Sequence, residues 1–191
     1  MNSTKKRVIG ISGSLRKDSL NTMALKLAAS KLPANVEVEL LDWRSVPPFD
    51  ADLLAAEGFP ASVAAIRERI AAADGVLIVT PEYNFSVPGM LKNLLDWISR
   101  GTDQPFARKP VAILSASGGP LGGARVQYEM RKLLQCLNAL PLAKPEVFIG
   151  NAPAKFDAEG QCKDEDTVRF VQAQMQAFAS WIDDVARMTA A

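Results

Sequence analysis

Five short apolar runs, separated by stretches of helical periodicity, most constrain the fold of this chain. Three of the runs are continuous rather than alternating in polarity, which is typical of parallel strands that helices cover on both faces. The runs span residues 8–12, 36–41, 76–80, 111–116 and 146–149. They predict an α/β fold with a five-stranded parallel sheet.

The stretches between and after these runs predict five helices. We expect the helices over residues 20–31, 62–73, 89–100, 123–140 and 164–187. Pro88 would begin the third helix, where its fixed φ and missing N–H cost nothing. Residues 151–163 are predicted to form a polar loop.

This alternation of strands and helices predicts a doubly wound, three-layer sandwich with strand order 2-1-3-4-5. In such a sheet, ligands bind beyond the carboxyl ends of the strands, where the strand order reverses beside the first strand. Three loops should therefore converge at one edge. They span residues 12–21, 81–88 and 115–123.

Length and charge favour one domain with a small-molecule partner. The 191 residues are 48% hydrophobic, which is enough for one well-buried core, so we predict a single domain over residues 1–191 with an ordered core of about 6–188. The formal net charge is +1 with both signs interspersed. That balance excludes the basic field that nucleic-acid binding requires.

Several residue classes exclude other functions. The two cysteines, Cys136 and Cys162, are far apart and form no CxxC motif, so we expect neither a disulfide framework nor a zinc site, and a cytoplasmic location fits. The first apolar run is too short for a signal-peptide core or a membrane span. Histidine is absent, which excludes Ser-His and Cys-His triads and histidine-based metal sites. We predict no metal site.

The loop after the first strand has the composition of an anion site. It reads Gly-Ser-Leu-Arg-Lys-Asp-Ser-Leu-Asn-Thr over residues 13–22. The N–H groups at a helix start lack internal partners and carry partial positive charge, and Arg16 can form a fork to phosphate oxygens. Ser14, Ser19, Asn21 and Thr22 would add further donors. A terminal phosphate monoester fits this loop best.

The other two loops supply different chemistry. Residues 81–88 offer a flat surface of aromatic and amide groups, and residues 115–123 offer a glycine-rich backbone. Together with the anion loop, they suit a phosphorylated planar heterocycle.

Three motifs in these loops carry a family resemblance. They are Gly-Ser-Leu-Arg-x-x-Ser-x-Asn at 13–21, Pro-Glu-Tyr-Asn with Ser-Val-Pro-Gly at 81–89, and Gly-Gly-Ala-Arg at 122–125. The chain resembles the NADPH-dependent FMN reductases of the flavodoxin-like superfamily, in particular the quinone and chromate reductase branch. The resemblance covers almost the whole chain, and the three motifs occur in the expected order.

The resemblance implies the contacts that bound FMN would make. The phosphate would lie in the first loop, which contributes Gly13, Ser14, Leu15, Arg16, Ser19, Leu20 and Asn21. The isoalloxazine ring would lie along Pro81, Glu82, Tyr83 and Asn84. The pyrimidine edge of the ring would meet Ser117, Gly118 and Gly119, where backbone N–H groups favour the negative charge of reduced flavin.

The implied activity is that of an FMN-dependent NAD(P)H oxidoreductase with a ping-pong mechanism and NADPH or NADH as donor. Quinones are the expected acceptors, with chromate, azo compounds, ferricyanide or free flavin as alternatives. A flavodoxin-type electron carrier is the main rival, although the strongly acidic surface of such carriers is missing. A receiver-type signalling domain would need acidic residues at strand ends that Ser12 and Thr80 occupy.

The resemblance also implies an assembly. Arg125 and Tyr128, with Glu146, match a polar network between the subunits of related oligomers, and the first two would alternatively border the acceptor entrance. We therefore expect a homotetramer built from dimers. The helix at 89–100, including Trp97, would contribute to a dimer contact that shapes the flavin pocket.

Overall fold

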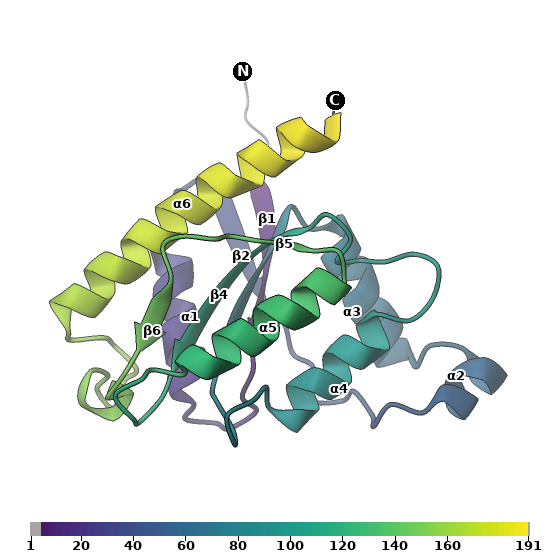
Figure 1. Cartoon of the computed structure of the whole chain (residues 1–191), viewed down its shortest axis with the longest axis horizontal. Helices are drawn as coiled ribbons and strands as arrows, with labels where there is room; N and C mark the ends of the chain where they lie inside the picture. Colours follow the sequence, from purple (N-terminus) through teal and green to yellow (C-terminus); the bar gives the residue numbers. More distant parts are fainter. Residues whose placement is uncertain (1–4, 191) are drawn as a thin grey trace.

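The computed structural model describes residues 5–190, in which a parallel sheet lies between two helical layers (Figure 1). The strands follow the order β2-β1-β3-β4-β5, and β6 pairs with β4. The order 2-1-3-4-5 predicted from the sequence is thus confirmed. The strands are β1 (Lys6–Ser12), β2 (Val36–Leu40), β3 (Gly75–Thr80), β4 (Pro110–Ala116), β5 (Leu140–Pro141) and β6 (Val147–Ile149).

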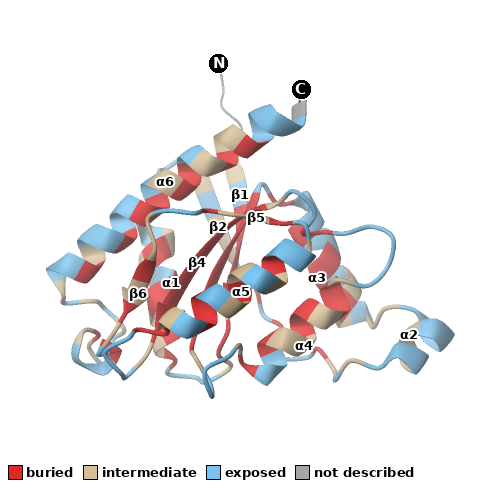
Figure 2. Ribbon diagram, viewed as in Figure 1, coloured by how far each residue is buried: buried red, intermediate tan, exposed pale blue. Residues whose placement is uncertain are grey.

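The helices cover both faces of the sheet. α1 and α6 pack on one face, and α3, α4 and α5 pack on the other. Every residue of β3 and β4 is buried, which explains why these strands are continuous apolar runs. Figure 2 shows β4 in the colour of buried residues. The helices are α1 (Leu20–Ser30), α2 (Ala51–Glu57), α3 (Ala61–Ala72), α4 (Gly89–Ile98), α5 (Ala124–Cys136) and α6 (Glu165–Ala190).

Two local elements were not predicted. Asp50 caps the seven-residue helix α2 by accepting hydrogen bonds from the N–H groups of Asp52 and Leu53. None of the residues of α2 is buried, so it lacked an apolar stripe that the sequence could reveal. The predicted polar loop at 151–163 contains a short 3₁₀ turn (Ala152–Ala154), and it packs Phe156 into the core.

The predictions at the edge of the sheet were partly wrong. The helix expected over 123–140 ends at Cys136, because Asn138 takes a left-handed conformation (φ 54°) that turns the chain. Leu140 then pairs with Pro110 as part of β5. The fifth position of the sheet therefore holds two short strands, β5 and β6, so the sheet has six strands rather than five.

Two buried glutamines bridge the interruption between β5 and β6. Gln174 of α6 donates to the carbonyls of Ile113 (3.1 Å) and Pro145 (2.9 Å). Gln127 of α5 donates to Ser115 Oγ (2.8 Å) and to the carbonyl of Val147 (2.7 Å). Because proline has no N–H to give to a ladder, these side chains supply the donors where backbone pairing stops.

Trp97 does not lie where the resemblance placed it. It is fully buried in the core beneath α4, and its indole N–H donates to the carbonyl of Pro47 (2.9 Å). The prediction that Trp97 contributes to a dimer contact was therefore wrong. A tryptophan on the inner face of an amphipathic helix fills core volume, and its one polar atom finds a partner there.

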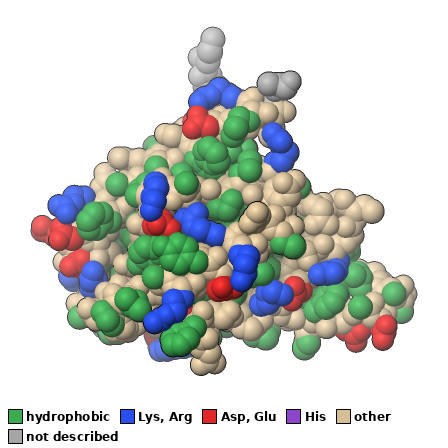
Figure 3. All heavy atoms as spheres, in the orientation of Figure 1, with side chains coloured by type: hydrophobic (Ala, Val, Ile, Leu, Met, Phe, Trp, Pro, Cys, Tyr) green, Lys and Arg blue, Asp and Glu red, His purple; other side chains and the backbone are tan. Residues whose placement is uncertain are grey.

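The surface agrees with the near-neutral composition. Figure 3 shows basic and acidic side chains interspersed over the face that carries α5 and α6. Among residues 5–190, no helix combines the length and the apolar character needed to cross a bilayer.

Candidate functional site

The loops after β1, β3 and β4 converge at one edge of the sheet, at the end opposite both chain termini (Figure 1). Gly13 brings the first two loops together. Its N–H donates to the carbonyl of Val79 (2.7 Å), and a Cβ at this position would lie 2.4 Å from Thr80 Oγ1. Only glycine permits this close approach of the backbone to β3.

The loop between β1 and α1 presents a row of free donors. Ser19 is the N-cap of α1, and its Oγ accepts hydrogen bonds from the N–H groups of Asn21 and Thr22. The remaining N–H groups around the turn donate to no protein acceptor in the described part of the chain. They belong to Leu15, Lys17, Asp18, Ser19 and Leu20. Free N–H groups at a helix start are an anion-binding arrangement.

The charged side chain of this loop is also available. Arg16 is exposed and forms no ion pair within residues 5–190. Ser14 is buried, and its Oγ accepts from the Arg16 N–H (3.4 Å), which holds the turn closed. Arg16 can therefore swing over an anion held by the backbone.

Asn21 has a structural partner. Its side-chain amide donates to the carbonyl of Ala116 (3.0 Å) and accepts from the Ala116 N–H (2.9 Å). Asn21 is only 4% exposed. This pair of bonds joins the start of α1 to the end of β4, so it fixes the first loop against the third.

The loop after β3 ends in a tight hairpin. Tyr83 and Ser86 exchange two backbone hydrogen bonds (3.1 and 2.9 Å), and Asn84 and Phe85 between them take positive φ values of 50° and 65°. This geometry is that of a type I′ turn. Tyr83 is 48% exposed and Phe85 is 69% exposed, so the hairpin presents two aromatic rings to solvent.

Glu82, predicted beside the flavin ring, is bonded to α5. Its Oε2 accepts from the N–H groups of Arg125 (3.0 Å) and Val126 (3.2 Å), and its Oε1 pairs with the Arg125 guanidinium (2.7 Å). The N-cap position of α5 is Gly123, which has no side chain to cap the helix. Glu82 supplies that cap from another loop. Its negative charge is also favourable there, because the N-terminus of a helix carries partial positive charge.

The loop after β4 offers an open backbone. The Ser117 N–H donates to the carbonyl of Ile149 (3.0 Å), which anchors the turn to β6. Gly119 is exposed, and a Cβ added there would meet no atom within 4 Å. The space around Gly119 would admit a side chain, and its absence leaves the backbone open to close approach by a ligand.

The three residues predicted at an interface or entrance do not form one network within the chain. The Arg125 guanidinium lies 4.2 Å from the centre of the Phe85 ring and so belongs to the site edge. Tyr128 is 58% exposed, and its ring lies 6.5 Å from that of Phe148. Glu146 pairs instead with Lys144 (2.5 Å), with Arg131 at 3.6 Å.

A pocket of about 600 Å³ lies between the first and second loops. Gly13, Ser14, Leu15, Arg16 and Tyr83 line it, together with four residues that the sequence analysis did not assign to a site: Trp43, Pro88, Gly89 and Met90. Trp43 follows β2 in a stretch with no recognisable motif. Its place in the pocket depends on tertiary packing, so no sequence signal could have found it.

Four groups with shifted pKa values lie outside these loops. Burial lowers the pKa of Lys109, whose Nζ donates to the carbonyls of Ala71 and Ala73. The hydrogen bond between Asp157 and Lys163 lowers the pKa of the first and raises that of the second. Hydrogen bonds from Thr167 lower the pKa of Asp164.

This arrangement fits FMN. The free N–H groups and Arg16 match a phosphate monoester, and the exposed hairpin and open Gly119 backbone leave room for a planar ring. Among residues 5–190, no cluster of three His, Cys, Asp or Glu side chains could hold a metal ion.

Comparison with known proteins agrees with this geometry. The profile of NADPH-dependent FMN reductases matches residues 6–154. The chain is 47% identical over 176 residues to an NAD(P)H-dependent FMN reductase of Pseudomonas aeruginosa, covering 92% of this chain and 95% of the relative. It is 46% identical over 185 residues to the quinone reductase of Escherichia coli K12, covering 96% and 98%.

A solved structure shows the same fold. The flavoenzyme NAD(P)H:(acceptor) oxidoreductase FerB of Paracoccus denitrificans superposes with a TM-score of 0.85 at 36% identity, covering 94% of this chain and 98% of that one. The match of the family profile spans most of the chain and includes all three loops of the site. The chain therefore belongs to the NADPH-dependent FMN reductase family and is an oxidoreductase.

Proposed function

We propose that the protein is an FMN-dependent NAD(P)H oxidoreductase that passes electrons to quinones by a ping-pong mechanism. The observation that carries the proposal is the row of free N–H donors around Arg16, placed at the same sheet edge as the open Gly119 backbone. One loop is suited to a phosphate and the other to the close approach of a ring.

Each loop has a part in holding FMN. The phosphate would lie on Arg16, Ser14 and the free N–H groups that precede α1. The ring would lie along the backbone of residues 81–84, and the turn at residues 117–119 would meet its pyrimidine edge. Asn21 and Glu82 act by tying these loops to β4 and α5, because their polar atoms are bonded there.

The side chains contribute positioning rather than proton transfer. Bound FMN would supply the chemistry of accepting a hydride from a nicotinamide and giving two electrons to an acceptor. Overall, one NAD(P)H and one proton reduce one quinone to its quinol and leave NAD(P)⁺. The chain contains no histidine, and the site is built to orient rings at close range.

The names of relatives support quinones as acceptors, since a 46%-identical protein is called a quinone reductase. We also propose alternative electron acceptors, namely chromate, azo compounds, ferricyanide and free flavin. Both NADPH and NADH are candidate donors. The enzyme would act in the cytoplasm, as the two unpaired cysteines favour.

We extend the proposal to assembly as a homotetramer built from two dimers. Exposed apolar side chains surround the site, among them Phe85, Leu121 and Tyr128, which are between 53% and 69% exposed. Large exposed apolar side chains of this kind favour burial against another surface. Light scattering with size-exclusion chromatography at micromolar concentration tests this, and a monomeric mass would contradict it.

An anaerobic titration tests the function itself. FMN-reconstituted protein is titrated with NADPH and then NADH while flavin absorbance is followed, and a quinone is added last. Bleaching followed by quinone-driven recovery is the expected result, and the two rates rank the donors. Binding of flavin without bleaching would indicate a flavodoxin-type carrier, and absence of flavin binding would refute the phosphate assignment.

A further inference from the structure

The hydroxyl of Ser115 is a buried tie between α5 and the loop that follows β4. Ser115 lies near the end of β4 and is fully buried. Its Oγ donates to the carbonyl of Gly122 (2.6 Å) and accepts from Nε2 of Gln127 (2.8 Å). A serine hydroxyl has one proton, so the bond that it accepts from Gln127 leaves this proton directed at Gly122.

Gly122 connects Ser115 to Gly119 in the turn of the same loop. The Gly122 N–H donates to the carbonyl of Gly119 (3.4 Å), which also accepts from the N–H of Asn151 (3.1 Å). Gly122 is itself closely confined, because a Cβ there would lie 2.6 Å from the carbonyl carbon of Phe148. The position of Gly119 thus depends on Ser115 through a short chain of hydrogen bonds.

The same turn directs backbone N–H groups away from the body of the protein. The Ser117 carbonyl accepts from the Ala152 N–H (3.0 Å), and in a trans peptide the next N–H, that of Gly118, points the opposite way. Within residues 5–190, neither the Gly118 nor the Gly119 N–H donates to a protein acceptor, and both residues are exposed. Two free donors side by side are suited to a ligand edge that gains negative charge.

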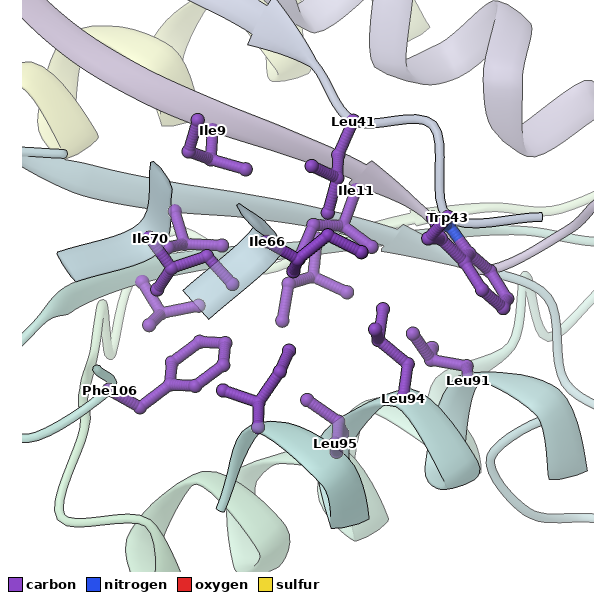
Figure 4. Close-up of a cluster of buried hydrophobic side chains, with 14 of the residues drawn as sticks. Ile9, Ile11, Leu41, Trp43, Ile66, Ile70, Leu91, Leu94, Leu95 and Phe106 are labelled. Carbon is purple, nitrogen blue, oxygen red and sulfur yellow. The ribbon is translucent and has the colours of Figure 1, made fainter. Parts of the chain in front are cut away.

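Gln127 lies on the buried face of α5, which the core holds in place. It is fully buried, and its Nε2 also donates to the carbonyl of Val147 in β6 (2.7 Å). Met130 and Leu134 on the same face belong to the core cluster that Figure 4 shows in part. Gln127 therefore gives the Ser115 hydroxyl a partner whose own position is fixed by packing.

We propose that Ser115 and Gln127 are positioning residues that set the reduction potential of bound FMN through this turn. The inference rests on the proposed function, which gives the pyrimidine edge of the ring to residues 117–119. Hydride transfer from the nicotinamide leaves one negative charge on the flavin, and donors held at its pyrimidine edge stabilise that charge. Because oxidised flavin lacks the charge, a correctly held turn favours the reduced form and raises the potential.

Two buried glutamines provide a matched test. Gln127→Leu and Gln174→Leu make the same change, and each glutamine donates twice from Nε2 and leaves its Oε1 without a partner within residues 5–190. Gln174 bonds only to two backbone carbonyls, one in β4 and one shortly before β6, so it is joined to the sheet but not to the turn. Ser115→Ala removes the bond to Gly122 directly.

The measurement is the midpoint potential of FMN bound to each variant, taken from the flavin absorbance during an anaerobic redox titration against a dye of known potential. The Kd of oxidised FMN and the Tm of the flavin-free protein are measured in parallel. The potential depends on the ratio of the Kd values for oxidised and reduced flavin, so a change that weakens both forms equally does not move it.

We expect Ser115→Ala to raise the Kd of reduced FMN about tenfold more than that of oxidised FMN, which lowers the potential of a two-electron couple by about 30 mV. Gln127→Leu should lower it by a smaller amount, because the Ser115 hydroxyl remains but is no longer directed at Gly122. The double variant should match Ser115→Ala, since both residues act through one bond. Gln174→Leu should lower the Tm about as much as Gln127→Leu and leave the potential at the wild-type value.

Two results would overturn the proposal. A wild-type potential in Ser115→Ala would show that the turn keeps its donors in place without this bond. Equal falls in potential in Gln127→Leu and Gln174→Leu would show that any loosening of the sheet edge changes the flavin. Failure of the proposed function is seen separately, since the wild-type protein would then bind no FMN, or its flavin would not bleach with either nucleotide.

Discussion

The cap that Glu82 provides to α5 should be the main stabilising link between the second loop and that helix. Replacing Glu82 with alanine removes two backbone hydrogen bonds, from Arg125 N (3.0 Å) and Val126 N (3.2 Å), together with the ion pair to the Arg125 guanidinium. Arg125→Ala is the natural control because it removes the ion pair and leaves both backbone bonds in place.

The two variants should differ clearly in magnitude. Loss of a helix N-cap costs about 1–2 kcal/mol. The ion pair adds at most about 1 kcal/mol, because the Arg125 side chain is 46% exposed to solvent. We therefore expect Glu82→Ala to lower the free energy of unfolding by about 2–3 kcal/mol, and Arg125→Ala by about 1 kcal/mol, of which part is its stacking on Phe85.

Unfolding of the flavin-free protein measures this difference without interference from ligand binding. In a domain of this size, Glu82→Ala should lower the Tm by roughly 4–12 °C. The FMN Kd of Glu82→Ala should also rise, since the hairpin at Tyr83 loses its anchor, whereas Arg125→Ala should keep its flavin. Equal destabilisation by the two variants would refute the capping role and leave only a surface ion pair.

Three further outcomes are expected. Arg16→Ala should raise the FMN Kd at least tenfold while leaving the Tm of the flavin-free protein unchanged, because Arg16 is exposed and its charge is free for a phosphate; an unchanged Kd would remove Arg16 from the site. Gly119→Ala should likewise weaken FMN without loss of apo stability, since its Cβ would meet only open space, and a drop in apo Tm would mean the turn itself needs glycine. Asp164 caps α6 and its pKa is lowered by Thr167, so its charge stabilises the fold above about pH 4 and this contribution is lost as pH falls through the lowered value. The difference in Tm between the wild type and Asp164→Ala, measured from pH 6 down to pH 3, should therefore become smaller on acidification. A difference that stays constant would contradict the stabilising role of the Asp164 charge.

The sequence was sufficient to predict that the three loops converge, because the topology leaves little choice. Continuous apolar runs must be buried on both faces, and right-handed crossovers then place every strand-to-helix loop at one edge. The motifs at residues 13–21 and 81–84 follow such strands, so their convergence could be predicted before the structure was known. The N-cap role of Ser19 in α1 follows from the local preference for serine at that position.

Other features depended on contacts between distant residues. The edge strand is divided into β5 and β6, and Gln174 and Gln127 from two helices bridge the interruption. No local sequence pattern predicts these contacts. Trp43 lines the pocket because its indole reaches Ser12, 31 residues earlier in the chain. Trp97 was misplaced because the hydrophobic pattern of a helix does not distinguish a core face from a subunit face.

The polar residues of the site divide into two groups with different physical tasks. Asn21 and Glu82, which their motifs place in contact with flavin, have their polar atoms bonded to β4 and to α5. The groups left free are backbone N–H donors, Arg16 and exposed rings. A ligand therefore meets loops that are already fixed to one another, and less of its binding energy is spent on ordering them. It follows that substitution of Asn21 or Glu82 should weaken FMN through loss of loop geometry, whereas substitution of Arg16 should weaken it through loss of charge.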